Sequence, residues 1–352
     1  MADDRQKLLG ITIAAGLALY AALSDRWLRR QSPIQRAGDG GRGRLAEEPA
    51  QITLAGWYDI LARVFTDIGR DNVSLMAAGI AFYALLSLAP ALTALVALYG
   101  LVFEPSQVEA QVKAVEGLIP AEGRQLIAQQ LGNVVHASSS TLGIGFILSL
   151  AVSIWSANYA TSAMMSALNV VYAESEKRKL VRYYGTTLVL TVSGVIFALL
   201  SLLLIAVIPA VLGLLPLGSF GKDLVSAARW PVLLLLCGSA LAVIYRYAPS
   251  RNEPRWSWVS WGAAAATLFW IVGSALFSLY VGRFATYNKT YGSLGAVVVL
   301  LMWFWMSAYA VLLGAALNAE MEHQTARDTT DRPKKPMGER GAYVADTIAD
   351  QR

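Results

Sequence analysis

The stretch LGAVVVLLMWFWMSAYAVLLGAALNA, residues Leu294–Ala319, decides the fold of this chain. It contains no Asp, Glu, Lys or Arg, and an apolar helix of roughly 20 residues crosses the hydrocarbon core of a bilayer. Five other stretches share these properties, with Arg283 only at the exit of one of them: Ala77–Phe103, Leu142–Tyr172, Tyr184–Leu215, Trp230–Tyr245 and Trp258–Phe284. The sequence therefore predicts an all-α integral membrane protein with a six-helix transmembrane core.

The composition of the whole chain agrees with this fold class. Of its 352 residues 56% are hydrophobic and only 15% are charged, a balance typical of polytopic membrane proteins. The net charge of +5 does not indicate nucleic-acid binding, because the basic residues lie in short segments beside the spans. The only cysteine, Cys237, lies within a span, so one chain can form neither a disulfide nor a Cys-based metal site.

Lys and Arg fall on alternating sides of the six spans. One side carries 21 of them, in Ser24–Arg70, Ala173–Arg182, Arg246–Arg255 and the residues after Glu320. The other side carries 6, in the loops 104–141, 214–229 and 283–292. Because cytoplasmic loops are enriched in Lys and Arg, we expect a multi-pass protein of a bacterial inner membrane with its C-terminus in the cytoplasm.

The chain divides into four predicted segments. Residues 1–28 contain the apolar run Leu8–Leu23, which we interpret as an extra N-terminal transmembrane helix, with an interfacial helix as the alternative. A signal peptide fits poorly, because acidic residues precede the run and arginines follow it. Residues 29–53 read as a flexible cytoplasmic linker, residues 54–322 as the membrane domain, and residues 323–352 as a disordered basic cytoplasmic tail.

Two amphipathic segments are expected outside the spans. Leu54–Ile68 places its apolar residues on one helical face, which suits either a helix in the membrane interface or a helix packed on other cytoplasmic segments. Glu104–Thr141 shows two such patterns separated at Ile119-Pro120, so we expect a helical hairpin on the outer surface. The hairpin either covers a cavity or rests on the helix ends.

Polar side chains within the spans are the candidates for a binding groove, because uncompensated polar groups rarely face lipid. Asn158, Ser162 and Asn169 share one helical face, and Ser307 and Asn318 lie on a small-residue stripe. Interhelical hydrogen bonds explain both stripes adequately, and lining a substrate path is the sharper alternative. Pro90 predicts a kink in the first span. The loop with Tyr287, Asn288 and Tyr291 is favoured as a rigid turn over a headgroup-binding loop.

An ordered series of motifs resembles the YihY/BrkB family of inner-membrane proteins. The motifs are DNVSLMAAGIAFYALLSLAPAL (Asp71–Leu92), Trp155–Tyr172 followed by ESEKR (Glu174–Arg178), YRYAP (Tyr245–Pro249), YNKTYGSLG (Tyr287–Gly295) and GAALNAE (Gly314–Glu320). The resemblance runs from about Trp57 to Glu322 and implies a six-helix core. It implies no established activity: transport is often proposed, the former label ribonuclease BN is regarded as mistaken, and one branch is linked to serum resistance.

Several residues fall on positions characteristic of that family, and the resemblance carries them over as structural-motif or groove residues. They are Tyr83, Pro90, Asn169, Tyr245, Pro249, Tyr287, Asn288, Tyr291, Gly292, Gly295 and Asn318. Many members have an acidic residue where this chain has Ala316, so a mechanism that requires that carboxylate does not suit this chain.

Enzymatic chemistry finds little support, and we expect no catalytic, metal or cofactor-binding residues. A zinc nuclease needs several His and acidic ligands, whereas this chain has only His136 and His323, on opposite sides of the predicted membrane. Intramembrane proteolysis would need His or paired Asp within a span, and the predicted spans contain neither.

The predicted function is transport, or handling of a lipid or small solute, through a polar groove in the helix bundle. The expected partners are membrane lipids and such a substrate, with no nucleic acid, and the sequence does not fix the oligomeric state. A non-transporting membrane scaffold or envelope-integrity factor, which would use Leu54–Ile68 and the basic tail, is the alternative.

Overall fold

The computed structural model describes residues 39–102, 139–202, 204, 219–283, 293–331 and 333–349. Within these residues the chain is helical and forms no β-strand beyond one isolated bridge between Pro254 and Thr330. Its elements in chain order are η2 (Asp39–Arg42), η3 (Pro49–Gln51), α2 (Leu54–Arg70), α3 (Val73–Val102), α6 (Ser139–Val171), α7 (Leu180–Leu202), α9 (Ser219–Tyr247), α10 (Trp256–Arg283), α12 (Ser293–Gln324) and α13 (Tyr343–Asp346). The prediction of an all-α membrane protein is confirmed.

The six predicted spans fall on α3, α6, α7, α9, α10 and α12. In the described part of the chain, four segments are long and apolar enough to cross a membrane: Leu180–Ala198, Trp230–Tyr247, Trp256–Val281 and Val297–Gln324. A fifth is counted if α2 and the first half of α3 form one span, which is bent by 62°. Residues 205–215 of the predicted third span lie outside the described residues.

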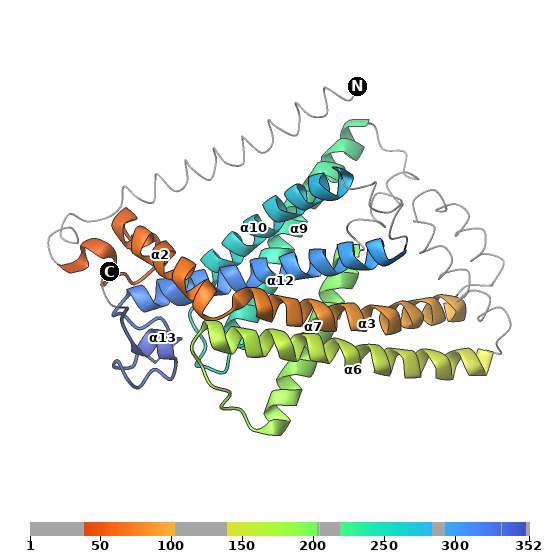
Figure 1. Ribbon diagram of the computed structural model, residues 1–352, viewed down its shortest axis with the longest axis horizontal. Helices are drawn as coiled ribbons and strands as arrows, with labels where there is room; N and C mark the ends of the chain where they lie inside the picture. The colour runs from red at the N-terminus through yellow and green to blue at the C-terminus, as the bar shows by residue number, and fades with distance from the viewer. Residues whose placement is uncertain are drawn as a thin grey trace.

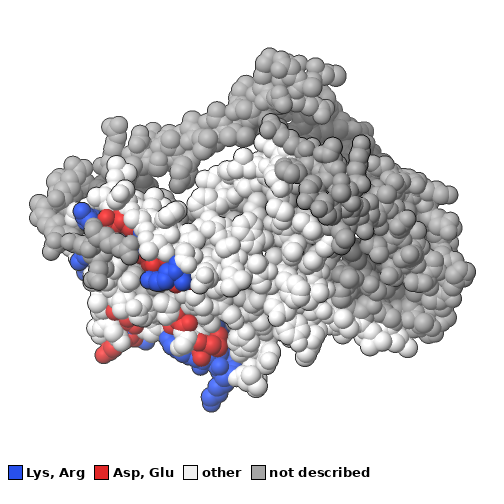
Figure 2. Space-filling view, in the orientation of Figure 1, with Lys and Arg blue, Asp and Glu red and all other residues white. Residues whose placement is uncertain are grey.

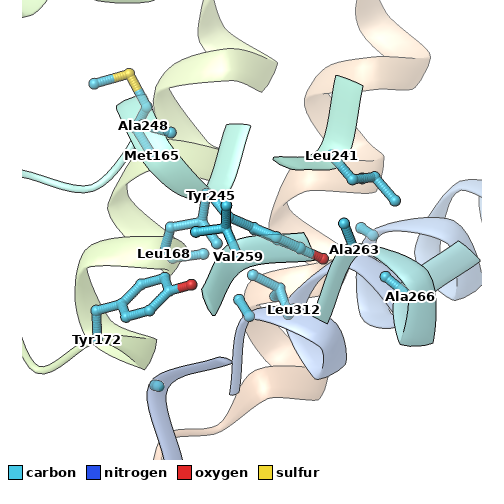
Figure 3. Close-up of a cluster of buried hydrophobic side chains, with 14 of the residues drawn as sticks. Met165, Leu168, Tyr172, Leu241, Tyr245, Ala248, Val259, Ala263, Ala266 and Leu312 are labelled. Atoms are coloured by element: carbon cyan, nitrogen blue, oxygen red, sulfur yellow. The ribbon is translucent and has the colours of Figure 1, made fainter. Parts of the chain in front are cut away.

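The helices pack around α3, α6 and α12. Helices α3 and α6 run side by side along their length, and α12 packs on α10 and α3 (Figure 1). Their shared core lies toward the end where α12 finishes, and Tyr172, Tyr245 and Leu312 are fully buried in it (Figure 3). Helix α7 packs more closely on α6 than on α9, and residues of α7 and α9 line a groove.

Charged side chains gather at one end of the molecule. Figure 2 shows Lys, Arg, Asp and Glu on the side that carries α2 and α13, while the described surface beyond them is white. We call this the polar end, and it comprises η2, η3, α2 and the segments 173–179, 248–255 and 323–349. The rest of the described bundle presents apolar side chains outward, as a surface in lipid should.

The tail and the second half of the linker are ordered, so the predictions of a disordered tail and a flexible linker are wrong for these residues. Segment 323–349 folds back on the polar end, where the backbone N–H of Arg255 donates to the carbonyl of Thr329 at 2.9 Å. The tail also contacts the linker: the N–H of Ala326 donates to the carbonyl of Arg44 at 2.8 Å. The polar composition misled the prediction because these groups bond to one another and to the bundle rather than to water.

Three predicted features lie outside the described residues. They are the N-terminal run Leu8–Leu23, nearly all of the hairpin in Glu104–Thr141, and the loop 284–292 with Tyr287, Asn288, Tyr291 and Gly292. The helix predicted for Leu54–Ile68 is α2, and it packs on α12.

Candidate functional site

A groove of about 1040 Å³ lies between α7 and α9 at the polar end. The wall from α7 includes Arg182, Thr186, Val189, Leu190 and Ser193. Their spacing of i, i+4, i+7, i+8 and i+11 places them on one face of the helix, over a length of about 16 Å. The segment Leu180–Ala198 is one of the candidate spans, so this wall leads from the polar end into the membrane.

The groove changes character along that direction. Six of the residues that line its polar end are basic and one is acidic: Lys177, Arg178, Lys179, Arg182, Arg246, Arg251 and Glu253. Deeper along the helices the lining is apolar or weakly polar, with Val189 and Leu190 from α7 and Val243 from α9. Such a surface fits a molecule with an anionic head and an apolar body.

Asn169 at the end of α6 fixes the mouth of the groove. Its side-chain Oδ1 accepts from the backbone N–H of Ser250 at 2.7 Å, and its Nδ2 donates to Glu176 at 3.1 Å. Arg178 extends this network by donating to Glu176 at 2.9 Å and to the carbonyl of Ala248 at 2.6 Å. The side-chain amide of Asn169 therefore connects the loop before α7 with the segment after α9. Residues of both segments line the groove.

The hydrogen bonds of this network change the pKa of the Glu176 carboxyl. Burial alone would raise the pKa of its carboxyl, but hydrogen bonds from the backbone and side chain of Arg178 and from Asn169 outweigh burial and lower the pKa. The carboxylate therefore stays charged and bound at neutral pH. Arg178 is consequently held by the protein and offers little charge to a ligand.

Two arginines of the lining are also neutralised within the chain. Arg251 forms a two-pronged pair with Glu322, at 2.9 and 3.0 Å, and both side chains are fully buried. Arg246 pairs with Asp331 at 2.7 Å and with Glu253 at 3.1 Å. Because their charges are satisfied by fixed partners, Arg251 mainly holds the end of α12 beside the groove and Arg246 mainly holds the tail there.

Lys179 and Arg182 differ from the other basic residues. Both are exposed at the start of α7, and among the described residues neither has an ion-pair partner. Lys177, in contrast, pairs with Glu174 at 2.7 Å. The uncompensated positive charge of the groove therefore comes from Lys179 and Arg182, beside the N-terminal end of a long helix, where anions are favoured.

A second cavity of about 450 Å³ lies under α2, between α2, α12 and the tail. It is lined by acidic and basic groups together, including Asp67, Glu320 and Arg63. Arg63 pairs with Glu320 and also donates to Gln324 at 2.7 Å. The lining has the carboxylates of Asp67, Asp71 and Glu320 and the two arginines Arg63 and Arg70, so most of its charge is compensated within the cavity.

Three of the predicted groove residues bond other helices instead. Asn318 is fully buried: its Oδ1 accepts from the N–H of Gly262 at 2.8 Å and its Nδ2 donates to the carbonyl of Val259 at 3.3 Å. Tyr245 donates to the carbonyl of Val311 at 2.7 Å. Ser307 accepts from the indole of Trp270 at 3.0 Å. These three side chains therefore form hydrogen bonds between packed helices, as the packing alternative in the sequence analysis expected.

The remaining predicted residues are dispersed. Pro249 is buried and lines the α7–α9 groove. Tyr83, partly exposed on α3, stacks on Tyr159 with ring centres 5.8 Å apart. Asn158 and Ser162 are half-buried on α6, and the Oδ1 atom of Asn158 has no partner among the described residues. Pro90 lies within α3, and Gly295 is buried near the start of α12.

The sequence analysis did not identify Lys179 and Arg182 as the groove cations that lack an ion-pair partner among the described residues. It used Lys179 and Arg182 only as topology signals, although Arg182 begins the helical face that continues through Thr186, Val189 and Ser193. That face is readable from spacing. The sequence does not show that the neighbouring basic residues pair with acidic side chains from other segments.

Among the described residues, no group of three or more His, Cys, Asp or Glu side chains is placed to hold a metal ion.

Comparison with known proteins identifies relatives over most of the chain. The family described as virulence factor BrkB matches residues 64–338. A Bacillus subtilis strain 168 protein described as ribonuclease-like, YfkH, is 32% identical over 251 residues, 69% of this chain and 87% of that protein. A UPF0761 membrane protein of Idiomarina loihiensis is 28% identical over 211 residues, 58% of this chain and 69% of that protein.

A UPF0761 membrane protein of Pseudoalteromonas atlantica is 24% identical over 293 residues, 79% of this chain and 94% of that protein. No solved structure matches the chain. The relatives therefore support a membrane protein, and the groove must be interpreted from its own geometry.

Proposed function

From the premise that this chain belongs to the virulence factor BrkB family of membrane proteins, we propose that it binds an anionic amphipathic lipid in the groove between α7 and α9 and handles it at the polar end. The observation that carries the proposal is the joint presence of a basic mouth with two unpaired cations and an apolar wall along α7. The polar side chains of Asn318, Tyr245 and Ser307 form hydrogen bonds between helices, so we propose the groove, rather than the interior of the bundle, as the binding site.

Selectivity would come from the headgroup. Bilayer tails are as apolar as a groove of Val and Leu, so moving an acyl chain from lipid into the groove gains little free energy. A Lys or Arg near an anionic headgroup contributes about 1 kcal/mol. Lys179 and Arg182 would therefore favour anionic over neutral lipid, while Val189 and Val243 accommodate any chain.

The handling is facilitated rather than ion-coupled. Proton- and sodium-coupled carriers usually place a carboxylate near the middle of the membrane, and the six predicted spans contain none. We further propose that the protein lies in the inner membrane with the polar end in the cytoplasm, because 21 of the 27 Lys and Arg residues flanking the spans lie on that side.

Native mass spectrometry of the purified protein, with bound species identified after denaturation, tests the proposal. The variant Lys179→Gln/Arg182→Gln should lose about 2 kcal/mol of binding free energy, or about 30-fold in affinity for anionic phospholipid. The matched control Lys334→Gln/Lys335→Gln removes the same charge from exposed tail residues and should retain the lipid.

A third variant tests the depth of the site. Val189→Trp narrows the apolar part of the groove without changing its charge, and it should also reduce retention. Equal retention in all variants would refute the groove as the binding site. An equal loss in the groove double variant and in the tail control would instead show attraction to surface charge in general, and would also refute it.

A further inference from the structure

Helix α2 turns its apolar side chains away from the protein. Leu54, Tyr58, Leu61 and Phe65 are 89%, 76%, 55% and 84% exposed. Their spacing of i, i+4, i+7 and i+11 places all four on one helical face. An ordered face of four large apolar side chains is unusual on a surface that meets water.

The charged residues of α2 point the opposite way. Asp59 and Arg63 are buried on the inner face, together with the apolar Ile60. Arg42 donates to Asp59 at 2.9 Å, and Arg63 pairs with Glu320 of α12. The helix is thus held to the bundle partly by ion pairs, while its outer face is apolar. This is the reverse of a helix that packs on a protein and faces water.

The junction with α3 sets the direction of α2. The chain bends by 62° between them, at Asn72, whose φ of 53° lies in the left-handed region. Beyond the bend, α3 continues with Leu75 and Phe82, which are 73% and 52% exposed. The exposed apolar side chains of α2 are therefore followed, directly after the bend that Figure 1 shows, by exposed apolar side chains of α3.

We propose that the outer face of α2 lies in the lipid leaflet at the polar end, so that α2 is an in-plane membrane helix docked by its charged face. The occupant of this face is the bilayer, as its continuity with α3 indicates. Arg70 is exposed at the end of α2 and pairs with Asp67 at 3.1 Å and Asp71, which suits the headgroup level. This inference does not depend on the proposed lipid site between α7 and α9.

Site-specific quenching tests this placement. In a Cys237→Ser background, Phe65→Cys is labelled with an environment-sensitive fluorophore, and the full chain is reconstituted in phosphatidylcholine–phosphatidylglycerol vesicles with brominated acyl chains. The label at Phe65 should be quenched by the brominated lipid and protected from aqueous iodide. Leu61→Cys should behave alike. Thr66→Cys is the matched control, because Thr66 is also exposed but lies about 100° from Phe65 around the helix.

Each result bears on the proposal. Lipid quenching at Phe65 and Leu61, with iodide quenching at Thr66, supports it. Iodide quenching at all three positions would show a water-facing helix and overturn it. Protection of Phe65 from both quenchers would show a protein partner, such as a second copy, and would overturn it as well.

Discussion

Gly262 and Gly314 face each other where α10 packs on α12. A Cβ atom built on Gly262 would overlap the carbonyl oxygen of Gly314 and the side chain of Asn318. One built on Gly314 would overlap the carbonyl of Gly262 and, at 2.6 Å, the hydroxyl of Tyr245. The missing side chains let the two backbones approach closely enough for Asn318 to reach the N–H of Gly262. The polar side chain of Asn318 therefore serves the packing of α12 on α10.

Substituting Gly262→Ala should therefore destabilise the bundle. The added methyl group would meet the backbone carbonyl of Gly314, which cannot move aside as a flexible side chain could. Overpacking of this kind costs about 1–3 kcal/mol. We expect a clearly lower thermal unfolding midpoint in detergent. Gly194→Ala, within α7, is the control, because its added methyl group meets nothing within 4 Å. A Gly262→Ala variant as stable as the control would refute the close contact.

The tail is the element that the sequence described least well. Arg340 is 5% exposed and organises it, donating to the carbonyl of Ala326 at 2.9 Å and to that of Ala345. Asp328 is a second centre. Burial opposes its charge, but hydrogen bonds from the backbone N–H of Lys335 and from Thr330 outweigh burial and lower its pKa. A tail held in this way is not a free basic arm, which weakens the scaffold alternative.

Arg340→Gln should release the tail. It removes charge-assisted hydrogen bonds to buried carbonyls, each worth about 1.5–3 kcal/mol, so the tail should open at least about tenfold more often. Limited proteolysis of the purified protein, read by the appearance of a shortened chain, measures this opening. The control Arg327→Gln changes an exposed arginine of the same segment and should be cut at the wild-type rate. Equal cleavage of the two variants would contradict the role of Arg340.

At the scale of the whole molecule, the charged side chains gather at the polar end, and the long helices extend from this end as an apolar bundle. The polar end joins parts of the chain far apart in sequence, and the fully buried pair Arg251–Glu322 lies within it. Arg251 also lies over the ring of Tyr172, 4.0 Å from its centre. Breaking a buried pair is costly, so this end should behave as one unit.

The orientation of that axis in the membrane is a prediction of the charge count. A green fluorescent protein fused after Arg352 should fluoresce, and alkaline phosphatase at the same place should be inactive, because the polar end carries most of the Lys and Arg. A phosphatase fusion after Lys289, in the opposite loop, should be active as the control. Active phosphatase at Arg352 would show the reverse orientation.

The sequence alone determined the membrane fold, the apolar segments that form candidate spans in α7, α9, α10 and α12, and the family. These follow from a one-dimensional property, the exclusion of charge from long apolar segments such as Leu294–Ala319, and from motifs in fixed order. It also offered helix packing as one of two interpretations of the small-residue stripe that carries Ser307 and Asn318.

Only the tertiary structure decided which polar groups are satisfied. Asp331 reaches Arg246 and Glu322 reaches Arg251 from remote parts of the chain, while Lys179 and Arg182 are left without ion-pair partners in the described residues. The charge of the groove and the order of the tail depend on these pairings. Composition cannot reveal them, because a charged residue has the same sequence signature whether its partner is water or a carboxylate brought near by folding.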